Sequence, residues 1–251
     1  MSKLLNPYEL KLMRQSGKIA ASALRKALES IKEGVDEMTV DKVAEETIYN
    51  LGGDLSYKDV PNYSFATCIS VNEQVVHGLP TKRKFENGDI VSVDLAVCFK
   101  GWHTDCAWSV VVGDSPSDND KRRFLKVGEQ ALWEAIEQAV EGKRVGDISN
   151  AIQERVEGAG YSVVRSLVGH GIGKKLHQEP EIPGYGQKGA GLKLKSGMSL
   201  AIEVIYTSGR HGVVLGEDGW TFSTADGSWG GLFEMTVVVG RKEAEVLMDL
   251  H

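Results

Sequence analysis

Apolar residues recur along the chain with two different periods. Between positions 8 and 33 they return at roughly every 3.6 residues, which predicts a helix with Pro7 at its start. Further helices are predicted over 39–51, 117–141 and 147–159; the first of these has Thr39 as N-cap and stops at Gly52 and Gly53. Alternating or continuously apolar runs predict strands over 66–71, 90–98, 105–112, 161–168, 198–206 and 232–239.

The predicted order, two helices followed by strands, occurs twice, and sequence similarity accompanies it. The segment 33–53 aligns with 141–161, and 87–97 aligns with 196–206 at nearly the same offset, so that Asp94 falls on Glu203. Glycine-terminated helices and glycine-led strands resemble each other in many proteins, but two blocks at one offset favour an internal duplication. We therefore expect a single domain over 1–251, built from halves of roughly 1–113 and 114–251.

Composition narrows the class of protein. With 41% hydrophobic and 25% charged residues in 251, the chain is typical of a globular protein and not of a disordered one. A formal net charge of -6 disfavours a non-specific nucleic-acid binder. Three cysteines without a zinc-type pair indicate a reducing compartment. The N-terminal residues contain no apolar run suited to a signal peptide or membrane span, so we expect a cytoplasmic protein that does not associate with a membrane.

Acidic residues interrupt two strands of a predicted hairpin. Lys100 and Gly101 mark its turn, and Asp94 and Asp105 lie directly opposite each other if the pairing axis falls between Phe99 and Lys100. Facing carboxylates repel each other, and a buried carboxylate without a partner is costly or takes up a proton. The pair therefore indicates a bound cation. The alternative, a solvated hairpin, conflicts with the apolar character of both strands.

Two further acids stand alone in apolar strands. Glu203 lies within MSLAIEVIY and Glu234 within GLFEMTVVVG. Either one by itself fits a strand edge, but with Asp94 and Asp105 they make four acids in four apolar strands. Four carboxylates would balance two divalent ions, and an oxygen-rich site with an imidazole suits Mn, Fe, Co or Zn. His170 is the candidate imidazole.

The segment 168–180, VGHGIGKKLHQEP, admits several interpretations. A phosphate-binding loop would need a third glycine followed by a helix, and this segment reaches a proline instead. We therefore expect Gly169, Gly171 and Gly173 to let the backbone pass close to the metal site while His170 reaches an ion.

Five blocks of sequence resemble the type I methionine aminopeptidases. In chain order these are SVNEQVVHGLP (70–80), the acidic hairpin (88–113), GHGIGKKLHQEP (169–180), KSGMSLAIE (195–203) and the segment 218–236. The resemblance covers nearly the whole chain. It implies the α+β pita-bread fold, in which two pseudo-symmetric halves form an antiparallel sheet with helices on the outer face, and an enzyme that removes N-terminal methionine by dinuclear-metal amide hydrolysis.

The resemblance also implies roles for individual residues. Two divalent ions (Co, Mn, Fe or Zn) would be bound by Asp94, Asp105, His170, Glu203 and Glu234. Glu203 is our candidate to take up the proton of the attacking water, and His77 and His177 would contact the substrate near the scissile bond. The methionine side chain would meet an apolar pocket, for which the candidates are Tyr63, Phe65, Cys68, Leu176 and Trp220.

Three positions depart from the pattern of the family. Val204 stands where a proline usually follows the first glutamate, Met235 where a histidine often follows the second, and Leu176 where an aromatic residue commonly precedes the second histidine. None of the three removes a ligand. We expect Leu176 and the stretch 59–68 to line the side-chain pocket, so that the departures bear on side-chain specificity and not on the chemistry.

Two alternatives share the implied fold. A prolidase or Xaa-Pro aminopeptidase would use the same metals but usually carries an additional N-terminal domain, which 251 residues would not accommodate. A non-catalytic binding protein would be expected to lose ligands, and none is lost. We expect a monomer whose partners are the N-terminal methionine residues of nascent polypeptides, and nascent-chain processing would suit association with the ribosome.

Overall fold

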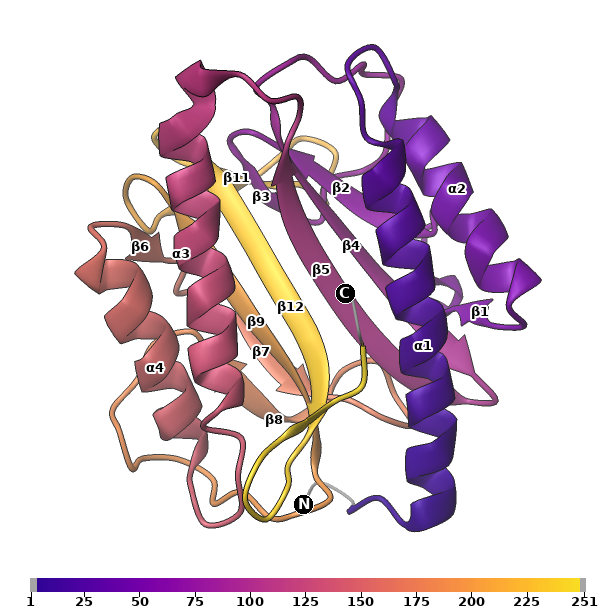
Figure 1. The fold of residues 1–251 in the computed structure, drawn as a ribbon, viewed down its shortest axis with the longest axis vertical. Helices are drawn as coiled ribbons and strands as arrows, with labels where there is room; N and C mark the ends of the chain where they lie inside the picture. Colours follow the sequence, from indigo (N-terminus) through magenta and orange to yellow (C-terminus); the bar gives the residue numbers. More distant parts are fainter. Residues whose placement is uncertain (1–3, 249–251) are drawn as a thin grey trace.

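The computed structural model describes residues 4–248, and its helices lie together on one face of a large twisted sheet (Figure 1). Within the described residues this sheet has ten strands, each antiparallel to its neighbours. The main path of the sheet runs through β1 (Asp54–Leu55), β4 (Ile90–Phe99), β5 (Trp102–Val111), β12 (Gly230–Val238), β9 (Ser199–Thr207), β7 (Val168–Gly171) and β8 (Gln178–Pro183). Flanking strands are β2 (Thr67–Val71) on β4, β6 (Ser162–Val163) on β9 and β13 (Glu245–Val246) on β12. Helices combined with an antiparallel sheet confirm the α+β class.

All four predicted helices are present, with shifted ends. They are α1 (Pro7–Ser30), α2 (Glu37–Asn50), α3 (Asn119–Ile136) and α4 (Val145–Gly158). Helix α1 begins at Pro7 as predicted, because the Asn6 side chain accepts hydrogen bonds from the N–H groups of Tyr8 and Glu9. Helix α3 is shorter than the predicted 117–141, since the chain beyond it forms a parallel bridge between Val140 and Gly240.

The predicted N-cap of α2 is wrong. Asp36 occupies the capping position, and its carboxylate accepts a hydrogen bond of 2.9 Å from the backbone N–H of Thr39. Aspartate is at least as favourable as threonine at an N-cap, and its charge also suits the positive end of the helix dipole. The helix ends just before Gly52, which has a positive φ of 79° and lets the chain leave the helix as expected.

Both faces of β4 are buried, which explains its strongly apolar character. The side chains of Val91, Val93, Leu95 and Val97 pack into one core cluster with α1 and α2. The opposite face carries Asp94 and Ala96, which are also buried, and on this face, among the described residues, only a short 3₁₀ helix, η1 (Ser56–Asp59), is seen to contact β4, through the hydroxyl of Tyr57. The helical layer therefore fixes which face of the sheet turns toward the candidate site.

The register of the β4–β5 hairpin differs from the prediction. Asp94 opposes Ala107, and Asp105 opposes Ala96, so the two aspartates are diagonal neighbours and not direct partners. Lys100 and Gly101 have positive φ angles of 51° and 72°, as in the two-residue turns that suit hairpins. This tight turn places the pairing axis between Lys100 and Gly101. A shift of two residues in register preserves the face, so both aspartates still point to the same side.

The chain between 161 and 183 also differs from the prediction. The single strand expected over 161–168 is wrong: β6 and β7 are separated by a bend at Arg165 and Ser166. His170 and Gly171 belong to β7, and β8, which is absent from the sequence prediction, pairs with them. A second sheet, absent from the sequence prediction, joins β3 (Gln74–Val76) to β11 (Phe222–Thr224) and β10 (Val213–Leu215).

The two halves have similar layers. Helices α1 and α2 contact each other and α1 contacts β4 and β5, while α3 and α4 contact each other and α3 contacts β12 and β9. In Figure 1 the two helix pairs lie side by side over the one sheet. An internal duplication stays a prediction. Within residues 4–248 no helix is long and apolar enough to cross a bilayer.

Candidate metal centre

Five adjacent strands each contribute one acidic or imidazole side chain to one place on the sheet. A row of paired positions runs across β4, β5, β12 and β9, and consists of Asp94, Ala107, Glu234 and Glu203. A neighbouring row, two residues along, contains Asp105 on β5 and His170 on β7, whose cross-strand partner is Ala201. Side chains two residues apart on a strand share a face, so these five groups converge.

The convergence is close enough for shared ligands. His170 Nε2 lies 4.0 Å from Asp105 Oδ2 and 3.9 Å from Glu203 Oε1. Ligand atoms lie within 4.8 Å of one another in each of three overlapping groups: Asp94, Asp105 and Glu234; His170, Glu203 and Glu234; and Asp105, His170 and His177. Every carboxylate selected from the sequence belongs to at least one of these groups.

The carboxylates are poorly compensated by the protein itself. Asp105 Oδ1 and Glu234 Oε1 are buried side-chain oxygens without a hydrogen-bond partner among the described residues. Burial raises the pKa of Asp94 to about 6. Burial, followed by repulsion from neighbouring carboxylates, raises the pKa of Asp105, Glu203 and Glu234 well above the ordinary range. A bound cation would lower these pKa values again, and the two unpartnered oxygens could coordinate it. The set of ligand atoms therefore fits a divalent metal.

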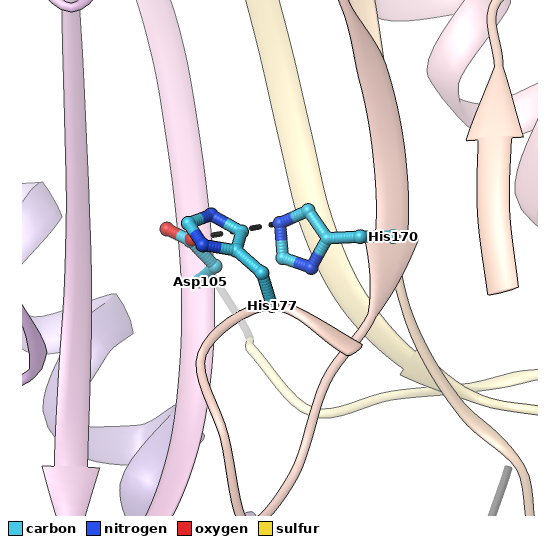
Figure 2. A group of neighbouring side chains, drawn as sticks. All are labelled: Asp105, His170 and His177. Carbon is cyan, nitrogen blue, oxygen red and sulfur yellow. Dashed lines mark ion pairs between the residues drawn. The ribbon is translucent and has the colours of Figure 1, made fainter. Parts of the chain in front are cut away.

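Two histidines approach the cluster from different elements. Figure 2 shows the rings of His170, from β7, and His177, from the loop before β8, turned toward each other and toward the carboxylate of Asp105. The ring centroids of the two histidines are 4.4 Å apart. Burial and the neighbouring His177 lower the pKa of His170 to about 4, so its ring is neutral at pH 7 and can donate a lone pair to a metal.

The glycines around His170 permit close packing of strands. A Cβ on Gly169 would lie 2.7 Å from the carbonyl oxygen of Ala201, and one on Gly171 would lie 2.1 Å from that of Glu179. Neither glycine has a positive φ, so the requirement is for space and not for unusual backbone angles. Gly173 differs, because a Cβ there would meet nothing nearer than 3.5 Å. The expectation of close backbone approach therefore holds for Gly169 and Gly171 only.

A cavity of about 210 Å³ opens above the cluster. Its wall includes Tyr63, Cys68 and Trp220, as the sequence suggested for the side-chain pocket, and its floor carries the five candidate ligands. The rings of Tyr63 and Trp220 meet edge to face, with centroids 5.1 Å apart. An apolar wall beside a charged floor suits a ligand with a polar end and an apolar side chain.

Two candidates for this pocket lie outside its lining. Phe65 packs edge to face on Tyr63, at a centroid distance of 5.8 Å, and so contacts a residue of the wall. Leu176 is buried in the same core cluster and lines a separate, adjoining cavity together with His103 and Lys175. That Phe65 and Leu176 contact the methionine side chain stays a prediction.

His77 lies at the rim of the same cavity. Its φ is +58°, which is rare for a residue with a side chain, and the following Gly78 is pressed against the carbonyl oxygen of Ile69. Burial and the nearby His177 lower the pKa of His77. The cavity lining therefore includes a neutral imidazole on a strained backbone.

Sequence reasoning missed several residues of the cavity. Tyr57 donates a hydrogen bond of 2.9 Å from its hydroxyl to Asp94 Oδ1. Apolar side chains complete the wall, and besides Val60 these are Val76, Leu167, Val168, Ile205 and Leu232. No local pattern identifies them, because they come from segments that meet only in the folded chain.

Two of the three positions that depart from the family pattern do not face the cavity. Val204 and Met235 follow the glutamates on β9 and β12, so their side chains point to the opposite face of the sheet. Both are buried in the core cluster beneath α3 and α4. The substitutions at these two positions therefore change the packing under the helices and leave the cavity lining untouched.

Convergent carboxylates and an imidazole at the floor of a cavity define a metal-dependent hydrolytic class of site. Comparison with known proteins makes this more specific. Metallopeptidase family M24 matches residues 11–241. The methionine aminopeptidase of Clostridium perfringens is 41% identical over 97% of both chains, and methionine aminopeptidase 1 of Bacillus subtilis is 39% identical over 96% of both. The chain therefore belongs to metallopeptidase family M24.

A solved structure agrees with this assignment. The crystal structure of methionine aminopeptidase from Thermotoga maritima matches with a TM-score of 0.96 and 40% identity, covering 99% of this chain and 100% of that one. The pita-bread fold implied by the sequence resemblance is confirmed. Membership in a metallopeptidase family also agrees with the uncompensated carboxylates, which require a divalent cation.

Proposed function

We propose that the chain is a metal-dependent methionyl aminopeptidase that removes the N-terminal methionine from peptides and nascent proteins. One observation carries the proposal: five adjacent strands place Asp94, Asp105, Glu234, Glu203 and His170 on the floor of one cavity. The similarity to methionine aminopeptidases over nearly the whole chain supports the substrate class.

Two divalent ions, Co, Mn, Fe or Zn, would be held by these five residues. When bound, they would polarise the scissile carbonyl and make water a nucleophile near neutral pH. The charges favour two ions over one, because four carboxylates around a single divalent ion would leave a buried excess of negative charge.

The protein groups divide the remaining work. Glu203, whose side chain lies within 3.9 Å of His170 Nε2 and opposite Glu234, takes the proton from the water and passes it to the departing amine. His177 donates a hydrogen bond to the oxyanion that develops on the scissile carbonyl. His77, at the cavity rim, contacts the amide at the scissile bond and orients the departing nitrogen.

The cavity wall selects the side chain. Tyr63, Cys68 and Trp220 offer an apolar surface beside the charged floor, which suits a long, flexible thioether. The free α-amino group would lie at the floor among the carboxylates. The methionine side chain would be buried against the wall, and the amine would be bound at the floor. Together these contacts would place the first peptide bond between His77 and His177.

Peptide cleavage tests the function. The purified chain should release methionine from a Met-Ala-Ser peptide, lose this activity after chelation, and regain it when Co²⁺, Mn²⁺ or Fe²⁺ is added back. An N-acetylated form of the same peptide is the matched control and should not be cleaved, because it lacks the free amine. Activity that persists without metal, or a preference for Xaa-Pro peptides, would contradict the assignment and favour the prolidase-like alternative.

Action on nascent chains in the cytoplasm, association with the ribosome and a monomeric state are further parts of the proposal. The cysteine use typical of a reducing compartment supports the cytoplasm, and the chemistry of methionine removal supports the nascent chain and the ribosome. Sedimentation of the tagged chain with ribosomes from a lysate, with and without high salt, tests the ribosome contact. Gel filtration with light scattering tests the monomer.

A further inference from the structure

Tyr57 links the pocket wall to the metal-binding floor. It lies in a short 3₁₀ helix, η1 (Ser56–Asp59), and its side chain is buried and lines the cavity. Its hydroxyl lies 2.9 Å from Asp94 Oδ1. The phenol O–H donates this hydrogen bond and the carboxylate oxygen accepts it.

The hydrogen bond restrains one ligand of the cluster. Asp94 is the acid at the β4 edge of the row, and it forms a group with Asp105 and Glu234. Tyr57 donates to one of its oxygens and so restrains the rotamer of a carboxylate that could bind a cation. Such hydrogen bonds to ligating carboxylates orient them and commonly account for 10- to 100-fold in metal affinity, as an order of magnitude.

Among the described residues, the hydroxyl of Tyr57 hydrogen-bonds to Asp94 and to neither of the neighbouring acids, Asp105 and Glu234. Asp105 and Glu234 each have a buried oxygen without a hydrogen-bond partner among the described residues. Asp94, in contrast, accepts a hydrogen bond from the hydroxyl of Tyr57. The restraint therefore acts on the side of the cluster formed by Asp94, Asp105 and Glu234. The group of His170, Glu203 and Glu234 does not include the carboxylate that Tyr57 holds.

The other side of the Tyr57 ring belongs to the substrate pocket. Its ring meets that of Tyr63 edge to face, at a centroid distance of 5.4 Å, and Tyr63 in turn meets Trp220 at 5.1 Å. These rings line the same cavity. A side chain that fills the pocket would thus press on a set of rings whose last member is hydrogen-bonded to a ligand.

We propose that Tyr57 is a positioning residue: through its hydrogen bond to Asp94 it sets the affinity of the Asp94–Asp105–Glu234 side of the cluster for a divalent cation. This rests on the proposed function, because it requires that the cluster bind metal. It adds a residue outside the five candidate ligands, and it assigns that residue to one side of the cluster.

Calorimetric titration of the metal-free protein with Mn²⁺ tests the proposal. The Tyr57→Phe variant keeps the ring and removes only the hydroxyl. We expect one binding event to weaken by about 10- to 100-fold, while the other changes by less than about 3-fold. In peptide cleavage, kcat at limiting Mn²⁺ should fall and should recover with excess Mn²⁺, with little change in KM.

Tyr63→Phe is the matched control. Its hydroxyl is also buried in the pocket wall, but it hydrogen-bonds to the Thr67 carbonyl oxygen and contacts Cys68 Sγ instead of a candidate ligand. Mn²⁺ affinity should therefore stay within about 3-fold of that of the parent chain. Equal weakening in both variants would assign the effect to general loosening of the pocket and overturn the proposal.

The remaining outcomes separate this proposal from the proposed function. A parent chain that binds no divalent metal overturns both. A parent chain that binds Mn²⁺ with two events, together with a Tyr57→Phe variant that binds identically, overturns only the role of Tyr57. Thermal unfolding of the metal-free variant is measured in parallel. A variant that no longer folds without metal would show that the hydroxyl is needed for folding and would also overturn the proposal.

Discussion

Glu203 on β9 and Glu234 on β12 are direct cross-strand partners in a buried ladder. Like charges at directly opposed positions destabilise a sheet, and burial removes the water that would screen them. Both carboxyls have a pKa raised well above the ordinary range, first by burial and then by neighbouring carboxylates. The pair is therefore a source of instability in the metal-free protein and a ligand pair when a cation is present.

Replacing Glu203 by Gln should separate chemistry from folding. We expect kcat to fall by at least about 100-fold, because the proton acceptor is lost. The free energy of unfolding of the metal-free protein should stay equal or rise, since one of two facing carboxylates is removed. Peptide cleavage and urea unfolding measure the two effects. An active Glu203→Gln variant would show that another group accepts the proton.

The metal-free protein should become less stable as the pH rises above 6.5. A carboxyl with a raised folded pKa binds more protons in the folded state, so its contribution is lost as pH rises toward that pKa. Asp94 has a pKa of about 6 and releases its proton mostly below pH 6.5. The pKa of Asp105, Glu203 and Glu234 is raised well above the ordinary range.

The histidines change the stability of the metal-free protein in the opposite direction, and they do so at lower pH. The pKa of His170 is lowered from 6.5 to about 4, so its contribution to stability is lost as the pH falls through that interval. Above pH 6.5 the carboxyls therefore dominate. Urea unfolding at pH 6.5, 7.2 and 8.0 measures the slope, and saturation with Mn²⁺ should flatten it. A metal-free protein that gains stability over this range would contradict the charge assignment.

The glycines beside His170 give a steric test with an internal control. Gly171→Ala would place a Cβ 2.1 Å from the Glu179 carbonyl oxygen, and we expect a loss of about 1–3 kcal/mol in the free energy of unfolding. Metal affinity should fall too, because β7 carries His170. Gly173→Ala meets nothing nearer than 3.5 Å and should change the free energy of unfolding by no more than about 0.5 kcal/mol. Equal effects would refute the close-approach explanation.

His170 and His177 should respond differently to alanine. Because His170 lies near both Asp105 and Glu203, we expect His170→Ala to lose bound metal and activity together. His177→Ala should keep its metal and lose about 100-fold in kcat, as for removal of an oxyanion donor. Metal content by plasma emission and peptide kinetics measure the two effects. Loss of metal from His177→Ala would instead make His177 a ligand, as its place beside Asp105 and His170 would allow.

Chemically costly residues were the most informative part of the sequence. Four carboxylates in apolar strands conflict with local burial rules, and the structure brings all four together with His170. The helix positions followed from a period that local packing imposes, whereas their exact ends depended on caps such as Asp36 and on the bridge from Val140 to Gly240. Local sequence patterns thus predicted the positions of the helices, because these depend on interactions between residues close in the sequence.

Distant contacts decided the rest. Asp94 and Asp105 share a face as predicted although the predicted register is wrong, because a shift of two residues leaves every side chain on the same face of the sheet. The hydrogen bond from Tyr57 to Asp94, the burial of Leu176 in a cluster with Tyr63 and the break between β6 and β7 arise from segments far apart in the chain. The sequence by itself determined which side chains need a cation, since desolvation of charge is costly in any fold. Only the tertiary structure decided how those side chains are shared and supported, because that depends on which strands become neighbours.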